Sequence, residues 1–262
     1  YDYEINIDAL KTVLICFLEK SPVLHSSFND NHVNPYWEVK DYDIEDVLTV
    51  SRPENVKEAI DEFLTQYIPP ESDLQIKVAV FFYEGKSALC IVENHMCRDG
   101  GDFKYFIKTL CKNYNDYVEK GIPPLDIKQG SRSYDEVYDD FSDGEEEMAR
   151  NLYKNVCAKD DHQFPLTEPS DDDKSFIARR KISEETFLKI KSTGKKHGAT
   201  VNDMLVAAYF YALYELGNYC LEDSVTISCA IDLRRHMDTA EDLGLTNHTA
   251  FMQCNIPERG RD

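Results

Sequence analysis

The amino-acid sequence predicts an α/β protein of two lobes, with mixed sheets covered by helices. Segments with apolar residues at helical spacing alternate with short apolar runs that are typical of strands. Residues 125–175 are acidic and poor in aliphatic side chains, so we interpret them as a solvated connection between the lobes. Hydrophobic residues make up 42% of the 262 residues, which is sufficient for a sizeable buried core. The lobes are assigned to residues 1–165 and 166–262.

Three helices are expected in the first lobe. Residues 5–20 carry apolar side chains at helical spacing. Residues 53–68 show a second amphipathic pattern, with Pro53 in the first turn of the helix. A third helix is expected from about residue 102 to residue 118, ending at Gly121.

A strand hairpin is expected between the second and third helices. The apolar runs IKVAVFFY and SALCIVENH flank the short link Glu84-Gly85-Lys86. This pattern is typical of two largely buried strands joined by a tight turn.

The second lobe is expected to begin with a strand over FIARRKIS and to continue with helices over residues 184–198 and 200–217. Thr200 and Asp203 form an N-cap pattern with an acidic third residue. Apolar residues occupy nearly every face of that last helix, which predicts burial on most sides. Two further strands are expected over VTISCAIDL and HTAFMQCNI.

Composition excludes several classes of function. The 29 Lys+Arg against 49 Asp+Glu give a formal net charge of -20, which disfavours nucleic acid and anionic membranes as partners. No uncharged stretch of about 20 residues could span a bilayer, and no signal peptide opens the chain. The 8 cysteines form no C-x-x-C pair, which indicates buried thiols in a reducing compartment. A cytoplasmic location is therefore expected.

The stretch NHMCRDG at residues 94–100 is the main candidate site. His95 ends an apolar strand, and a neutral imidazole with its usual pKa of about 6.5 can remove a proton from a hydroxyl, amine or thiol. Asp99, if the turn folds it inward, needs a cationic or hydrogen-bonding partner. Gly100 and Gly101 permit the positive φ angles that such a turn requires.

Three other interpretations of this stretch stay open on the residues alone. His95 could be an ordinary histidine at a strand end, followed by a plain turn. His95, Cys97 and Asp99 alternate and could share a metal ion, although no second cluster offers further ligands. A hydrolase with Cys97 as nucleophile would need its thiol within hydrogen-bond reach of the imidazole.

Several segments together resemble one superfamily of acyltransferases. ENHMCRDGGDF resembles the H-H-x-x-x-D-G motif of the superfamily that includes nonribosomal peptide synthetase condensation domains, wax ester synthases and alcohol acetyltransferases. EKSPVLHSSF is similar to the upstream R-H-P-x-L-R-x-x-F motif, with His25 where Arg is usual, and GATVNDMLVAAYFYAL resembles the helix that opens the second lobe. TISCAIDLRRHM and GLTNHTAFMQCNIP resemble two later strands, and the segments keep the superfamily's order.

This resemblance implies a fold and a site. The fold would be the two-lobed sandwich of chloramphenicol acetyltransferase, with a substrate tunnel between the lobes. Because each lobe of the superfamily has about 150–200 residues, the second lobe is expected to be incomplete here. The second motif histidine, which acts as the base, aligns with His95.

The resemblance also assigns roles around His95. Asp99 would be structural and paired with Arg234, whose alternative is a solvated surface charge. Gly100 matches the glycine that lets the pantetheine arm of the donor pass close to the backbone. Asn94, which replaces the first motif histidine, and Asn247 are expected to line the tunnel.

The predicted function is transfer of an acyl group from a thioester to an alcohol or amine. Coenzyme A is favoured as co-substrate over the phosphopantetheine of a carrier protein, and no permanently bound cofactor or metal is expected. The alternatives are a condensation-like domain that uses carrier-bound substrates and a docking module without catalysis. The 262 residues by themselves could lack activity under any of these interpretations. The acyl length, the acceptor and the oligomeric state are not encoded in these motifs.

Overall fold

The computed structural model describes residues 1–123, 127–128, 130, 135–138, 141–156, 175–219, 225–237 and 246–256. The chain forms two compact units, which are Tyr1–Asp140 with Asp232–Ala250 (unit 1) and Phe141–Ile231 with Phe251–Asp262 (unit 2). Each unit has a hydrophobic core of its own. The predicted lobe boundary between residues 165 and 166 lies outside the described residues.

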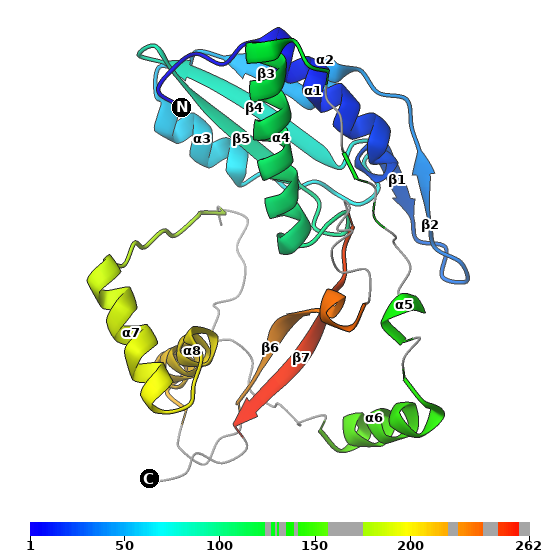
Figure 1. Cartoon of the computed structure of the whole chain (residues 1–262), viewed down its shortest axis with the longest axis vertical. Helices are drawn as coiled ribbons and strands as arrows, with labels where there is room; N and C mark the ends of the chain where they lie inside the picture. Colours follow the sequence, from blue (N-terminus) through cyan, green and yellow to red (C-terminus); the bar gives the residue numbers. More distant parts are fainter. Residues whose placement is uncertain are drawn as a thin grey trace. The chain divides into compact units, whose positions relative to one another are not determined.

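A mixed three-stranded sheet forms the centre of unit 1 (Figure 1). β3 (Leu48–Ser51) pairs parallel to β4 (Ile76–Tyr83), and β4 pairs antiparallel to β5 (Lys86–Glu93). The link between β4 and β5 has positive φ at Glu84 (48°) and Gly85 (73°), as a tight hairpin requires. The predicted hairpin is therefore confirmed.

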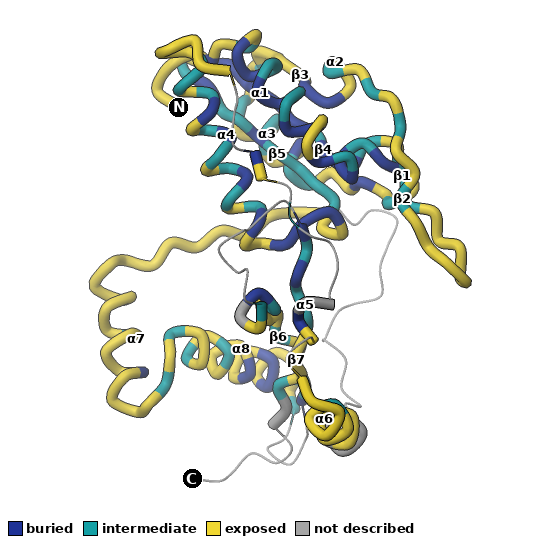
Figure 2. Tube along the Cα trace, turned by 45° about the vertical axis from the view of Figure 1, so that its right-hand side comes forward, coloured by how far each residue is buried: buried dark blue, intermediate teal, exposed yellow. Residues whose placement is uncertain are grey.

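Helices cover both faces of this sheet. α1 (Ile7–Lys20) and α4 (Gly100–Lys120) pack on one face, and α3 (Val56–Leu64) packs on the other (Figure 1). Alternate side chains of β4 enter the two cores, with Val78, Val80 and Phe82 on the first face and Ala79 and Phe81 on the second. β4 is consequently buried along almost its whole length (Figure 2).

The core between α1 and α4 is closed by an aromatic pair. The rings of Phe17 and Phe106 meet edge to face, with centroids 4.9 Å apart and planes at 89°. Neither side chain is accessible to solvent. This arrangement matches the preferred geometry of two aromatic quadrupoles, and it holds α4 in register over the sheet.

The predicted helices of unit 1 are present, with shifted starts. α4 begins at Gly100 with Asp99 as its N-cap and ends at Gly121, which has a φ of 65°. α3 begins at Val56, so the expectation that Pro53 lies in its first turn is wrong. The physical reason is the side chain of Asn55, which accepts a hydrogen bond from the N–H of Glu58 and caps the helix there.

Unit 1 also contains short elements that the sequence patterns did not predict. They are η1 (Pro22–His25), β1 (Ser26–Asn29), β2 (Tyr36–Val39), α2 (Ile44–Val47), β3, α5 (Asp135–Tyr138) and η2 (Leu233–His236). β1 and β2 pair antiparallel in a hairpin of their own.

Among the described residues, unit 2 contains α6 (Asp143–Val156), α7 (Glu184–Lys196), α8 (Val201–Gly217) and most of β6 (Val225–Asp232) and β7 (Thr249–Ile256). The predicted capping pattern of α8 is confirmed, because Thr200 and Asp203 form a reciprocal capping box. Over the residues that the structure describes, the buried members of the core of this unit are Phe210, Leu213, Tyr214 and Val225.

Two expectations for unit 2 are wrong. FIARRKIS forms no strand, since Phe176 is 83% exposed and no described strand pairs with this segment. α8 is not buried on most sides, because Leu205 and Tyr211 are 55% and 62% exposed. Its sequence is apolar all round, but among the described residues only one side of the helix meets a core.

No helix over the described residues is long and apolar enough to cross a membrane. The cysteines that the structure describes are all free thiols. The cytoplasmic location stays a prediction.

Candidate functional site

His95 lies in a turn directly after β5. The side-chain oxygen of Asn94 accepts a hydrogen bond from the N–H of Met96 (3.0 Å), and this contact turns the chain away from the strand. The N–H of Cys97 donates to the carbonyl of Asn94 (3.0 Å) and closes the turn. His95 itself is exposed in this turn.

Asn94 is anchored by Gln75, a fully buried residue that immediately precedes β4. The Nδ2 of Asn94 donates to the Oε1 of Gln75 (2.9 Å) and to the carbonyl of Ile68 (3.3 Å). The Nε2 of Gln75 in turn donates to three carbonyls, those of Ser26, Pro70 and Ser72. The two amides therefore fix the start of the His95 turn. No sequence pattern pointed to Gln75.

Asp99 has its two carboxylate oxygens in different roles. Oδ1 accepts from the N–H groups of Gly101 (2.8 Å) and Asp102 (3.1 Å), which caps α4. Oδ2 accepts from Nη2 of Arg234 (2.8 Å) and from the N–H of His248 (2.8 Å). Burial acts to raise the pKa of Asp99, but these hydrogen bonds outweigh it and hold the pKa below its usual range.

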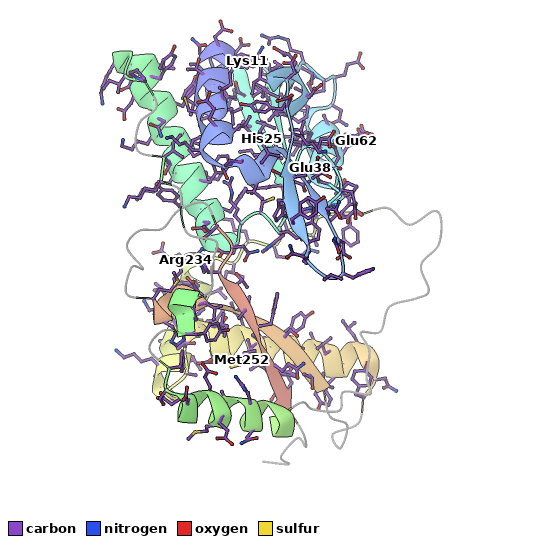
Figure 3. The ribbon with its side chains drawn as sticks, turned by 90° about the vertical axis from the view of Figure 1, so that its right-hand side faces the viewer. Lys11, His25, Glu38, Glu62, Arg234 and Met252 are labelled. Atoms are coloured by element: carbon purple, nitrogen blue, oxygen red, sulfur yellow. The ribbon has the colours of Figure 1, made fainter. Side chains whose placement is uncertain are left out.

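Arg234 is the buried cation of the site, so the alternative of a solvated surface charge is excluded. It lies in η2, just after β6 (Figure 3), and is only 6% exposed. Its guanidinium contacts three carboxylates, at 2.8 Å for Asp99, 2.6 Å for Asp102 and 2.9 Å for Asp232. The structure thus brings Asp99 and Arg234 together across 135 residues of sequence.

Gly100 and Gly101 are the first residues of α4, and neither has positive φ, so that expectation is wrong. The turn ends at Asp99, and the cap that Asp99 provides starts the helix at once. A Cβ on Gly101 would lie 3.2 Å from Oδ1 of Asp99 and 3.6 Å from Nη1 of Arg234, whereas a Cβ on Gly100 would meet nothing within 4 Å. Of the two glycines, Gly101 is therefore the one whose side chain would press against the ion pair.

Asp102 is a second buried carboxylate in the same turn of α4, and sequence reasoning missed its role. Its Oδ2 accepts from Nη2 of Arg234 (2.6 Å) and from the N–H (2.8 Å) and hydroxyl (2.9 Å) of Thr246. Its Oδ1 is buried and has no hydrogen-bond partner among the described residues. Burial raises the pKa of Asp102, and these contacts compensate only in part. The available signal was its position three residues after Asp99, which is where the third residue of a helix capped by Asp99 lies.

Asn247 touches the candidate base from the other side. Its Nδ2 donates to the backbone carbonyl of His95 (2.8 Å). Its neighbour His248 is buried, with Nδ1 2.8 Å from the hydroxyl of Thr246. The segment GLTNHTAFMQCNIP, which contains Asn247, therefore contacts the turn that carries His95.

A pocket of about 340 Å³ opens beside His95. Its walls combine apolar side chains with the motif turn, namely Leu64, Ile91, Val92, Glu93, Asn94, His95, Arg98, Asp99, Gly100 and Phe103. Arg98 and Glu93 form a buried ion pair (2.7 Å), and the guanidinium of Arg98 stacks 4.2 Å from the ring centroid of Phe106. The pocket can hold a small, largely apolar group next to the imidazole.

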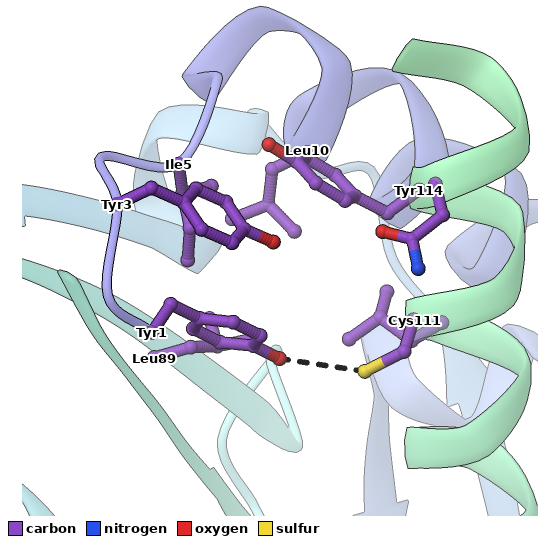
Figure 4. Close-up of a pocket in the computed structure, with 9 residues that line it drawn as sticks. Tyr1, Tyr3, Ile5, Leu10, Leu89, Cys111 and Tyr114 are labelled. Atoms are coloured by element: carbon purple, nitrogen blue, oxygen red, sulfur yellow. Dashed lines mark hydrogen bonds between the residues drawn. The ribbon is translucent and has the colours of Figure 1, made fainter. Parts of the chain in front are cut away.

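A second pocket of about 70 Å³ lies away from the motif, between the N-terminal segment and α4 (Figure 4). Tyr1, Tyr3 and Tyr114 surround it, and the hydroxyl of Tyr1 lies 3.4 Å from the sulfur of Cys111. Its size suits little more than a few water molecules.

The alternative chemistries find no matching geometry around His95. Cys97 is fully buried, and its thiol points to the carbonyl of Val23 (3.8 Å), so it is not placed as a nucleophile for the exposed imidazole. Asp99 is committed to Arg234 and to backbone N–H groups. Over the described ranges, no group of three His, Cys, Asp or Glu residues could hold a metal ion.

A known protein family matches almost the whole length of the chain. The model of the family described as "Condensation domain" matches residues 1–250. The chain belongs to the condensation domain family.

Among curated proteins, this condensation domain is similar to bacitracin synthase 1 of Bacillus licheniformis, with 25% identity over 255 residues. That match covers 89% of this chain and 4% of the synthase.

Solved structures share the fold. The epimerization domain from the third module of tyrocidine synthetase B has a TM-score of 0.68 at 14% identity and covers 100% of this chain and 61% of its own. The first condensation domain of the CDA synthetase gives 0.68 at 14% identity, with 97% and 61% covered. Polyketide synthase associated protein 5 from Mycobacterium tuberculosis gives 0.64 at 18% identity, with 99% and 62% covered. The predicted α/β fold of the chloramphenicol acetyltransferase type is confirmed, and the chain spans roughly three fifths of these structures.

Proposed function

We propose that this condensation domain transfers an acyl group from a thioester to an amine or hydroxyl, with His95 as general base. The observation that carries the proposal is the exposed His95 beside a pocket of about 340 Å³, on a turn that the amides of Asn94 and the buried Gln75 fix at one end. A base must lie within hydrogen-bond reach of the proton it removes, and this placement provides that reach for a group in the pocket.

The acyl donor would be a phosphopantetheine thioester. Membership of the condensation domain family and the similarity to bacitracin synthase 1 support a donor bound to a carrier protein. The preference for coenzyme A stays a prediction, since both donors present the same thioester arm. Gly100 carries no side chain and has open space around its Cβ position, which agrees with a close approach of that arm.

In the proposed reaction, His95 takes the proton of the acceptor N–H or O–H as the acceptor attacks the thioester carbonyl carbon. The new C–N or C–O bond forms, the C–S bond breaks, and the proton passes from His95 to the leaving thiolate. Asp99 and Arg234 do not touch the reactants in this scheme. They hold the end of the turn that carries His95, while Asn94 lines the pocket and Asn247 donates a hydrogen bond to the carbonyl of His95.

The test measures thiol release by the full-length natural protein, with acyl coenzyme A or an acylated carrier protein as donor and a panel of amines and alcohols. H95A is expected to lower acceptor-dependent release by at least about 10². H32A is the matched control, because the side chain of His32 is 93% exposed and its nearest carboxylate is that of Asp30, away from the motif. Unchanged release in H95A would refute the base, and no release from either donor would favour a docking module.

A further inference from the structure

Each of the residues 246–248 forms a hydrogen bond with the segment from His95 to Asp99. The carbonyl of Thr246 accepts from the N–H of Asp99 (3.2 Å), and the N–H of His248 donates to Oδ2 of Asp99 (2.8 Å). Between them, Asn247 donates to the carbonyl of His95 (2.8 Å). All of these residues belong to unit 1. The position of the His95 backbone therefore depends on where residue 247 is held.

Asp102 holds that segment from the helix side. Its Oδ2 accepts both the N–H and the hydroxyl of Thr246, the residue directly before Asn247. Asp102 has no accessible surface, so these contacts form in a water-free environment where each one is strong.

The ion pair with Arg234 does not by itself explain why Asp102 is a second buried carboxylate. Asp99 already gives the guanidinium a buried carboxylate at 2.8 Å. A second buried carboxylate adds desolvation and repulsion from Asp99, and the raised pKa of Asp102 reflects both. What Asp102 adds and Asp99 does not is the double contact with Thr246.

We propose that Asp102 is a positioning residue, which fixes the carbonyl of His95 through Thr246 and Asn247 and so sets the direction of the imidazole. The inference rests on the proposed role of His95 as base. A displacement of about 1 Å at a catalytic group is sufficient to cost up to about 10² in rate.

The kinetic test uses D102A, N247A and the double variant. Each single change is expected to lower kcat at least about tenfold with little change in KM, because substrate binding is intact and the base is misaligned. The double variant should be no slower than the slower single variant, since both changes break one path. Effects that multiply in the double variant would overturn the proposal.

The control for losing a buried polar group on the same helix is N113A. Asn113 is 4% exposed on α4 and donates to the carbonyl of Thr109 (3.0 Å), away from the motif. Normal kcat is expected in N113A. D102N should recover part of the activity lost in D102A, because its amide oxygen can still accept from Thr246.

A second readout does not depend on catalysis. The Cε1–H resonance of His95, assigned with H95A, is followed by ¹³C-resolved NMR. D102A and N247A should displace it to a similar position, whereas N113A should leave it unchanged. An unmoved resonance in folded D102A would overturn the inference. Displacement in a protein that shows no transfer would leave the positioning role standing and would count against the proposed function instead.

Discussion

At the scale of single residues, Asp99 and Asp102 show how position decides the chemistry of identical side chains. Both contact Nη2 of Arg234, yet the pKa of Asp99 is lowered and that of Asp102 is raised. Asp99 accepts hydrogen bonds on both oxygens, so its charged form is well solvated by the protein. One oxygen of Asp102 is buried without a partner among the described residues, so burial dominates there.

This difference predicts opposite effects of pH on stability. The folded-state pKa of Asp99 lies below its unfolded value, so ionised Asp99 stabilises the fold above the usual aspartate pKa of about 3.9, and this stabilisation is lost as the pH falls through the folded pKa. D99N should therefore lower the urea midpoint of unfolding at neutral pH. The difference in midpoint between D99N and the wild type should become smaller at acidic pH.

Asp102 is the matched comparison for that experiment. Its folded-state pKa lies above the unfolded value, so the folded protein holds this proton more tightly, and the contribution to stability declines as the pH rises through that window. The urea midpoint of D102N should thus rise relative to that of the wild type as the pH rises above the usual aspartate pKa. Parallel pH profiles for D99N and D102N would contradict this assignment.

The candidate site was predictable only as far as the motif reached. The motif named His95 and Asp99, the resemblance of a later segment added Arg234, and the structure brings Asp99 and Arg234 together. It could not name Gln75 or Thr246, because their roles come from contacts with residues 19 and 144 positions away. Side-chain and backbone hydrogen bonds at such separations leave no periodic trace in a sequence.

At the scale of elements, α8 depends on its capping box. The hydroxyl of Thr200 accepts from the N–H of Asp203 (3.2 Å), and a carboxylate oxygen of Asp203 accepts from the N–H of Thr200 (2.7 Å). T200A should lower the free energy of unfolding by about 1 kcal/mol, as expected for loss of an N-cap.

The control for T200A is S192A. Ser192 is exposed near the end of α7, and its hydroxyl only returns to the carbonyl of Lys189 (3.0 Å) within the helix. Its replacement by Ala should change stability by less than about 0.5 kcal/mol. Equal losses in chemical denaturation of the two variants would show that the capping box does not support α8.

Elements whose signals are local could be predicted, whereas those that need a distant partner could not. α1, the β4–β5 hairpin and the cap of α8 follow from spacing, a tight turn and a capping pair. β3 has four residues and exists because β4 lies beside it. The segment FIARRKIS has the residues of a strand and finds no described partner.

At the scale of the whole molecule, the two units differ in how much core they possess. In unit 1, both faces of the sheet are packed, while the described core of unit 2 has four buried members. Amides of β4 and β5 should therefore exchange hydrogen for deuterium far more slowly than those of β6 and β7. Exchange followed by mass spectrometry tests this, with the exposed helix α7 as the fast reference. Equal protection of both strand pairs would contradict it.

The long-range contacts of the site also bear on the order in which it can be made during synthesis. The bonds that complete the His95 turn join residues 135, 149 and 152 positions apart. A growing chain emerges from the ribosome N-terminus first, so β4, β5 and α4 are available long before residues 232–248 exist. A nascent chain can thus form much of the core of unit 1 before residues 234–248 contact the turn that carries His95. The last hydrogen bonds to this turn come from a later part of the chain. An incompletely translated product would therefore contain His95 without the contacts that fix its position.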